Sequence, residues 1–133
     1  MTDLEALALT AWKEARGEGE AGMRAVMHVI MNRVGKPGFG KTIQEVIFGK
    51  NQFTSMSVPS DPEFDIEPQN GDPQYEFCEQ LAQNIGSDQD NTNGALWYAN
   101  VPHITSGWFL EHIIDRPAQH PVLAEVGRQT FFA

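Results

Sequence analysis

Apolar residues recur at helical spacing from the start of the chain and predict a first helix. Its apolar stripe comprises Leu4, Leu7, Ala8, Ala11 and Ala15. Thr2 and Glu5 have the spacing of a capping box, so this helix should begin near Asp3. Glu5, Thr10 and Lys13 fall outside the stripe, and we expect them to face solvent.

A second helix is predicted from Glu20 to Val34, after a glycine-rich break. Its inward side is marked by Ala21, Ala25, Val26, Val29, Ile30 and Val34 and is widened by Met23, Met27 and Met31. A helix that is apolar over so much of its circumference is usually central and buried. We interpret His28 and Asn32 as structural polar groups, with Asn32 and Arg33 placed to anchor a neighbouring loop.

Capping signals predict two further helices. Thr42 and Glu45 repeat the capping-box spacing before a short helix that Gly49 should end. Asp72-Pro73 combines a capping side chain with proline at the first helical position, and Gly86 should end that helix.

The segments between these helices predict loops. Asn51–Ser55 is a polar loop with one aromatic residue, and Ser57–Asp72 is a long surface loop. Ser87–Gly94 is rich in Asp and Asn, but the pattern of a calcium loop fails because its sixth position is Asn93 and its twelfth is Ala99. We therefore expect turn chemistry there and no bound metal.

The last third of the chain predicts a minor sheet. Ala95–Ala99 is expected to be a short strand, and Pro121–Phe132 a terminal strand pair that turns at Gly127. Between them, Thr105 or Ser106 should cap a short helix. The predicted fold class is α+β and mainly α.

Composition limits the possible partners. The 133 residues suit one domain covering 1–133, and the net charge of −9 argues against nucleic acid and anionic membranes, which both reward basic patches. A single cysteine, Cys78, excludes an internal disulfide and suits a reducing compartment. The residues Met1–Glu5 lack the features of a signal peptide, and no apolar run reaches transmembrane length, so we expect synthesis in the cytoplasm without a signal peptide.

Glu14 is the candidate for acid chemistry. It falls on the flank of the first apolar stripe, directly before the glycine-rich break. Partial removal from water would favour the protonated form that a general acid needs. The alternative is an ordinary helix-end carboxylate or a salt bridge.

Several segments together resemble the cell-wall hydrolase family typified by the catalytic domain of bacterial spore-cortex-lytic enzymes. The matching segments are Glu14-Ala15-Arg16-Gly17-Glu18, Gly22, the Ala25–Val34 helix with its Asn32-Arg33 pair, Gln52-Phe53-Thr54, and Asp90–Tyr98 with its Asp-x-Thr-x-Gly-Ala-x-x-Tyr spacing. The family's Gly-Asn-His ending is matched only loosely by Gly127–Phe132, and Met23 stands where the family often has Gln.

The resemblance implies a lysozyme-like, lytic-transglycosylase-like fold that cleaves the bond between N-acetylmuramic acid and N-acetylglucosamine in peptidoglycan. It implies Glu14 as the catalytic acid, while Glu18 is interpreted as a structural partner of Arg16 or Arg33. Candidates for binding the glycan strand are Gln52, Phe53, Thr54, Tyr98 and Asn100, with Glu18 and Arg33 as supporting residues. No cofactor is expected, and the chain is expected to act as a monomer.

The chemistry leaves alternatives open. No second carboxylate is evident, which favours a lytic transglycosylase, in which one acid also serves as base, over a muramidase that uses water. A non-catalytic peptidoglycan-binding or virion module, and a cysteine peptidase or amidase using Cys78, are the other classes. Because no signal peptide is evident, the interpretation is a phage endolysin that reaches the cell wall after holin-type release.

Overall fold

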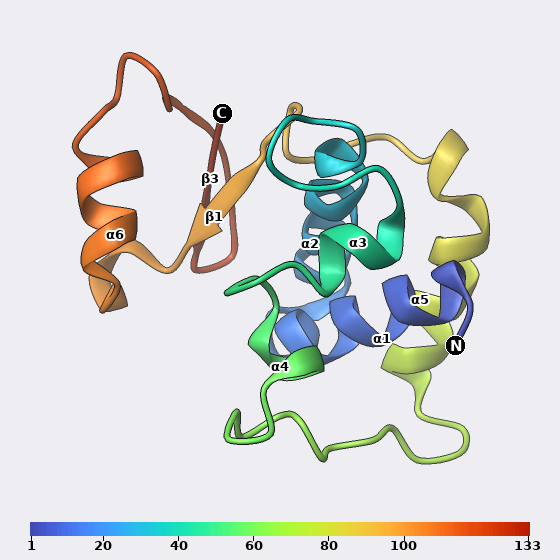
Figure 1. Cartoon of the computed structure of the whole chain (residues 1–133). Helices are drawn as coiled ribbons and strands as arrows, with labels where there is room; N and C mark the ends of the chain where they lie inside the picture. The colour runs from blue at the N-terminus through green and yellow to red at the C-terminus, as the bar shows by residue number, and fades with distance from the viewer.

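The computed structural model describes residues 1–133 and shows a helical body beside a small sheet and a separate helical arm (Figure 1). The helices are α1 (Asp3–Ala15), α2 (Gly19–Arg33), α3 (Ile43–Ile47), α4 (Thr54–Ser57), α5 (Pro73–Asn84) and α6 (Gly107–Phe109), and the strands are β1 (Trp97–Ala99), β2 (Val122–Val126) and β3 (Gln129–Phe132). Short 3₁₀ turns span Arg16–Glu18, Ile85–Ser87 and Val101–His103, and a π-helical turn spans Leu110–Ile114. The predicted α+β, mainly α class is confirmed. None of the helices combines the length and apolarity needed to span a membrane.

Local capping chemistry fixes where three helices begin, as predicted. The backbone N–H of Glu5 donates to Thr2 Oγ1 over 3.1 Å, and Thr2 N–H donates back to the Glu5 carboxylate over 3.4 Å. Thr42 caps α3 by accepting from the backbone N–H of Glu45 over 3.1 Å, but the predicted capping box is incomplete because the Glu45 carboxylate accepts from Lys41 N–H instead of Thr42 N–H. Asp72 caps α5. Each of these signals lies within four consecutive residues, so it can be recognised from the local sequence.

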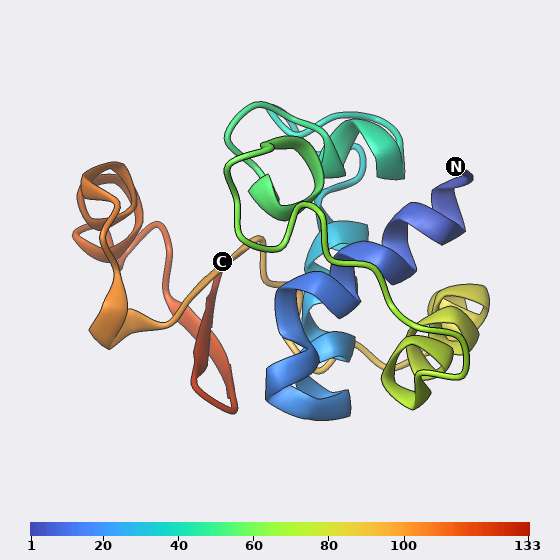
Figure 2. The same cartoon turned by 90° about the horizontal axis from the view of Figure 1, so that it is seen from below.

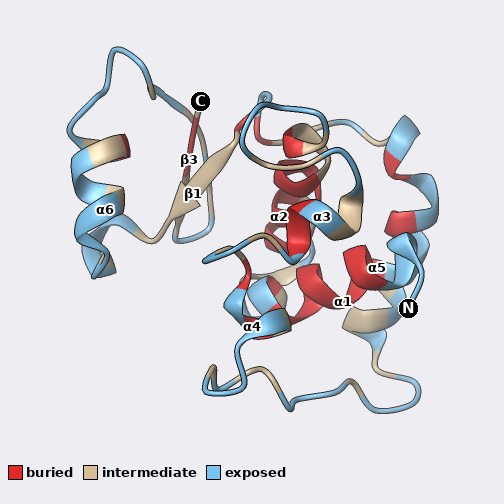
Figure 3. Ribbon diagram, in the orientation of Figure 1, coloured by how far each residue is buried: buried red, intermediate tan, exposed pale blue.

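Helix α1 lies at the centre of the body, and this corrects the predicted solvent face. It packs against α5, α2, α3 and α4, and the stretch Ala6–Lys13 is buried throughout (Figure 3). Thr10 is fully buried and donates its hydroxyl to Ala6 O over 2.7 Å. Lys13 is buried too, whereas Leu4 is exposed, so the prediction was wrong for all three residues.

The loop before α5 runs along the underside of the helical body (Figure 2) and is tied to it at Glu63 and Phe64. Lys13 Nζ donates to the carbonyls of Phe64, over 2.8 Å, and Ser55, over 3.3 Å. Arg16 forms an ion pair with Glu63. The long loop is confirmed from residue 58 onward, but the predicted Asn51–Ser55 loop is shorter because α4 begins at Thr54.

The sheet has the order β1-β3-β2 with antiparallel pairing throughout. The predicted terminal strand pair is confirmed, and Gly127 occupies its turn at φ 58°. The predicted first strand is shorter, because regular pairing begins at Trp97. Of the two possible caps for α6, Ser106 is the one used, accepting from Phe109 N–H over 3.2 Å.

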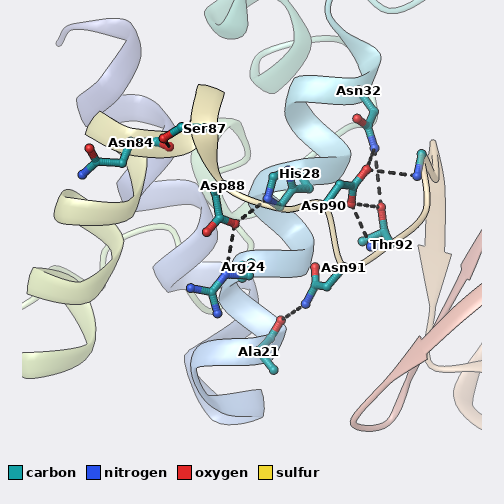
Figure 4. A network of polar contacts seen from close by, with 11 residues as sticks. Ala21, Arg24, His28, Asn32, Asn84, Ser87, Asp88, Asp90, Asn91 and Thr92 are labelled. Carbon is teal, nitrogen blue, oxygen red and sulfur yellow. Dashed lines mark hydrogen bonds and ion pairs between the residues drawn. The ribbon is translucent and has the colours of Figure 1, made fainter.

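Polar side chains of α2 anchor the segment that leads into β1 (Figure 4). Asp88 accepts from His28 Nε2 over 2.7 Å and from Arg24 Nε over 3.1 Å. Asp90 accepts from Asn32 Nδ2 over 2.9 Å and from the backbone N–H groups of Thr92 and Gly94, and it also accepts the Thr92 hydroxyl. The predicted anchoring role of Asn32 is therefore confirmed.

Protein donors thus surround the Asp90 carboxylate. Burial alone would raise the pKa of Asp90, but the hydrogen bonds from Thr92, Asn32 and Gly94 outweigh it and hold the pKa below its usual value. These hydrogen bonds connect the end of α2 to the start of β1, so Asp90 stabilises the junction between body and sheet.

Replacing Asp90 by Ala is expected to lower the free energy of unfolding at pH 7 by about 1–3 kcal/mol, because it leaves these donors without their acceptor. The folded-state pKa lies below the unfolded value, so this stabilisation is present at neutral pH and is lost as the pH falls below about 4. Urea unfolding between pH 3 and pH 7 is the measurement. Asp65→Ala, at an exposed loop position, is the control. A difference between wild type and Asp90→Ala that did not shrink at low pH would contradict this account.

Candidate active site

A pocket of about 760 Å³ lies between the helical body and the strand β1 with its following arm. The body contributes Glu14, Arg33, Lys50, Asn51, Gln52 and Phe53, and the other wall contributes Trp97, Tyr98, Ala99, Asn100, His103, Ile104, Thr105, Ser106, Trp108 and Phe109. Segments far apart in the sequence therefore meet here. Glu14 is the one carboxylate in the lining.

Glu14 lies in the last turn of α1, where both of its oxygens accept hydrogen bonds. The hydroxyl of Tyr98 donates to Oε1 over 2.9 Å, and the hydroxyl of Ser55 donates to Oε2 over 2.7 Å. The residue is exposed, so the expected partial burial was wrong. Two donors from β1 and α4 fix the carboxyl instead, and it forms no salt bridge. This arrangement can hold an acid in one orientation while one side stays open to a ligand.

Tyr98 remains a hydroxyl donor over the whole physiological range. Burial raises the pKa of Tyr98 well above its usual value, and the charge of Glu14 and the hydrogen bond to it act in the same direction. Arg33 acts in the opposite direction but does not outweigh them. The ring of Tyr98 stacks on Phe131 with centroids 5.5 Å apart, which holds the hydroxyl toward Glu14.

Arg33 connects the two walls of the pocket, because it donates to a residue on each side. Its Nε donates to Leu96 O over 2.7 Å, and its Nη1 donates to Gln52 Oε1 over 2.9 Å. The guanidinium carbon lies 4.7, 5.1 and 5.4 Å from the ring centroids of Phe39, Trp97 and Phe53 respectively. Desolvation lowers the pKa of Arg33 to about 10, so the side chain is still charged at neutral pH. Its predicted role as an anchor is confirmed.

The structure brings together most of the residues expected to bind a glycan. Gln52, Phe53, Tyr98 and Asn100 line the pocket, and Phe53 adopts φ 29°, in the left-handed region that non-glycine residues rarely occupy. Thr54 does not line it; its hydroxyl donates to Asp61 over 2.6 Å. The neighbouring Ser55 is the hydroxyl that reaches Glu14, and this residue was missed. Thr54 and Ser55 are neighbours in the first turn of α4, and the sequence alone does not reveal which of their hydroxyls points toward Glu14.

Glu18 lies outside the pocket, and its partner differs from the expected Arg16 or Arg33. Its Oε1 accepts from Arg128 Nε over 3.0 Å, while Arg16 pairs with Glu63. A Cβ atom at Gly127 would come within 2.7 Å of Glu18 Oε2, and one at Gly22 would collide with the Glu18 side chain. Glu18 therefore attaches the β2–β3 turn to the start of α2.

Other reactive groups do not form a second centre. Burial raises the pKa of the Cys78 thiol to about 12, and its polar contact is Met23 Sδ at 3.4 Å. The thiol thus stays protonated and lacks a base, which removes support for a cysteine nucleophile. No group of three or more His, Cys, Asp or Glu side chains is arranged to hold a metal ion.

Comparisons with known proteins agree with this geometry. The spore cortex-lytic enzyme of Halalkalibacterium halodurans is 29% identical over 129 residues, which cover 97% of this chain and 34% of that protein. The Bacillus subtilis spore cortex-lytic enzyme is 30% identical over 106 residues, covering 80% of this chain and 32% of that protein. The chain thus spans about a third of the length of these curated relatives.

Solved structures extend the similarity to the whole fold. The catalytic domain of the germination-specific lytic transglycosylase SleB from Bacillus anthracis superposes with a TM-score of 0.74 at 27% identity, covering 98% of this chain and 93% of that one. The catalytic domain of the Bacillus cereus SleB protein gives a TM-score of 0.73 at 27% identity, with coverages of 98% and 89%. The model of the cell wall hydrolase family matches residues 17–132. The chain therefore belongs to the cell wall hydrolase family.

Proposed function

We propose that this protein is a lytic transglycosylase that cleaves the bond between N-acetylmuramic acid and N-acetylglucosamine in peptidoglycan, with Glu14 as its single catalytic acid. The observation that carries the proposal is the pocket of about 760 Å³ with Glu14 as its one carboxylate. The likeness to SleB, whose catalytic domain is that of a lytic transglycosylase, supports the same substrate class.

In the proposed reaction, Glu14 first donates its proton to the leaving glycosidic oxygen, and the bond from that oxygen to C1 of the muramic acid residue breaks. The resulting carboxylate then accepts the proton of the same sugar's 6-hydroxyl while its oxygen forms a new bond to C1. The product is a 1,6-anhydro ring, and Glu14 regains its proton. A water-using inverting or retaining muramidase would ordinarily use a second carboxylate, which the pocket does not provide.

Ser55 and Tyr98 would keep the Glu14 carboxyl in one orientation through both steps. Each donates to a different oxygen of the carboxylate form. When the carboxyl is protonated, one of the two hydroxyls can rotate and accept instead, since a hydroxyl carries both functions. Tyr98 cannot lose its own proton in this role, because its pKa is raised.

The pocket walls supply groups suited to a glycan. Gln52 Oε1 is occupied by Arg33, so its amide nitrogen is the group available to a sugar hydroxyl or acetamido oxygen. Asn100 offers a second amide from the opposite wall. Trp108 is 51% exposed and lines the same pocket, which suits stacking on a sugar face.

Glu14→Gln is expected to reduce the formation of anhydro-muropeptides from purified peptidoglycan by at least about 100-fold, because the amide cannot transfer the proton. Mass spectrometry of the products is the measurement. Glu18→Gln changes the neighbouring acid of the same motif outside the pocket, and it should retain activity. Products with a reducing muramic acid end would mean a muramidase, and unchanged activity in Glu14→Gln would exclude Glu14 as the acid.

Ser55→Ala and Tyr98→Phe are each expected to lower kcat about tenfold, with a smaller change in KM, because each leaves one oxygen of the proposed acid unpositioned. Ser57→Ala and Tyr75→Phe are the matched controls, because Ser55 and Tyr98 are the hydroxyls that donate to Glu14. Steady-state release of soluble muropeptides gives both constants. Variants of Ser55 and Tyr98 with wild-type kcat would refute the positioning role.

For the biological setting, we propose phage-induced lysis, in which the enzyme is made in the cytoplasm and reaches peptidoglycan after holin-type release. The unpaired, buried Cys78 is compatible with synthesis in a reducing compartment.

Purified protein is expected to lower the turbidity of permeabilised Gram-negative cells but not of intact ones. The rate should be highest at moderate salt, because salt screens repulsion between the anionic wall and a protein of net charge −9. Glu14→Gln is the control for lysis without catalysis. Absence of lysis at every salt concentration would reject the lytic setting.

A further inference from the structure

Lys50 stands at the apex of a turn at the pocket wall. The N–H of Gln52 donates to Gly49 O over 3.1 Å, which makes Lys50 and Asn51 the two central residues of the turn. Asn51 has φ 62°, in the left-handed region that Asn tolerates better than most residues. Figure 1 shows the segment between α3 and α4 leaving the helical body on the side that faces β1 and α6.

The turn is fixed from below by contacts already described. Gln52 is held by Arg33, and Phe53, the next residue, is buried beside the same guanidinium. The backbone that carries Lys50 is therefore anchored, although its side chain is exposed.

Lys50 is also a cation without an anionic partner. The three arginine–carboxylate ion pairs use Arg16, Arg24 and Arg128, and Lys50 belongs to none of them. Lys50 lines the pocket with no carboxylate other than Glu14 in the lining, in a chain whose net charge is −9. An unpaired lysine in a concave site of an acidic protein is a local attraction for a negatively charged group.

We propose that Lys50 binds a carboxylate of the substrate at the pocket, and so makes the enzyme selective for charged over neutral glycan strands. This inference rests on the proposed function. Peptidoglycan offers such a group in two places: the lactyl carboxylate of muramic acid residues that lack a peptide, and the carboxylates of the stem peptide. In both cases the ammonium of Lys50 forms a charge-assisted hydrogen bond with the carboxylate.

Arg33 is less free than Lys50 to follow a carboxylate. Its Nε and Nη1 are engaged by Leu96 and Gln52 and its guanidinium lies among three aromatic rings, which leaves Nη2 as its one nitrogen without a protein acceptor. Lys50, in contrast, has a flexible exposed side chain on a fixed backbone, which allows it to follow a carboxylate held by a bound sugar.

The test compares Lys50→Gln with wild type on three substrates: intact peptidoglycan, peptide-free strands with free lactyl carboxylates, and peptide-free strands whose lactyl carboxylates have been converted to methylamides. Lys50→Gln is expected to raise KM about two- to fivefold on a substrate that carries the recognised carboxylate, with kcat nearly unchanged. On the methylamide strands the two proteins should be equal. The ratio of KM values should fall toward one as salt is raised, because salt screens an exposed ion pair.

Comparing the three substrates distinguishes the lactyl carboxylate from the carboxylates of the stem peptide. An effect on the free-lactyl strands assigns the lactyl carboxylate, and an effect on intact peptidoglycan alone assigns the stem peptide. Lys41→Gln, at an exposed position outside the pocket, is the matched control and should leave all constants unchanged. Equal KM values for wild type and Lys50→Gln on both charged substrates would overturn the proposal, as would an equal effect on the methylamide strands.

Direct binding keeps this test independent of catalysis. Titration calorimetry of Glu14→Gln, with and without Lys50→Gln, on the same soluble strands measures affinity with no turnover. If wild type made no anhydro products but Lys50→Gln still weakened binding of charged strands, the proposed reaction would fail and the carboxylate site would stand. If no strand bound to either protein, the carboxylate site would be refuted as well.

Discussion

The buried guanidinium of Arg33 is the interaction on which the architecture of the pocket depends. It comes from the last turn of α2, a largely buried helix beside α1, and reaches the chain just before β1 and the turn before α4. A desolvated arginine needs acceptors for its donors and favourable contacts for its faces, and here two acceptors and three aromatic rings supply much of this. One side chain therefore sets the distance between the two walls.

This arrangement also explains how a carboxyl group from α1 meets hydroxyls from α4 and β1. Lys13, one residue before Glu14, holds the backbone of Ser55 and of the following loop, so α4 is fixed to the same helix turn that carries the acid. Tyr98 is fixed from the other side by Phe131 of β3. The site is thus assembled from rigid elements, and the long loop before α5 contributes no residue to the pocket lining.

Features encoded within a few residues could be predicted from the sequence, and features that need distant partners could not. The caps at Thr2, Thr42 and Asp72 are local, and all three occur as expected. The burial of Thr10 and Lys13 was missed because helical periodicity assumes one packed face, whereas α1 has neighbours on several sides.

In the candidate site, too, locally encoded features were predicted and features that depend on distant partners were not. The motif segments indicated Gln52, Phe53 and Tyr98. They did not indicate that Ser55 rather than Thr54 contacts Glu14, because that depends on how α4 packs against Lys13. The partner of Glu18 was equally out of reach, since Arg128 lies 110 positions away along the chain.

The packing of Glu18 against Gly22 and Gly127 gives these three residues a shared structural role. Glu18 occupies a space that exists only because two glycines, one on α2 and one in the hairpin, lack a side chain. Selection for folding alone would keep all three residues together, whether or not the enzyme turned over substrate. Folding therefore places its own demand on position 18: the shape of the side chain fits the two glycines, and its charge pairs with Arg128.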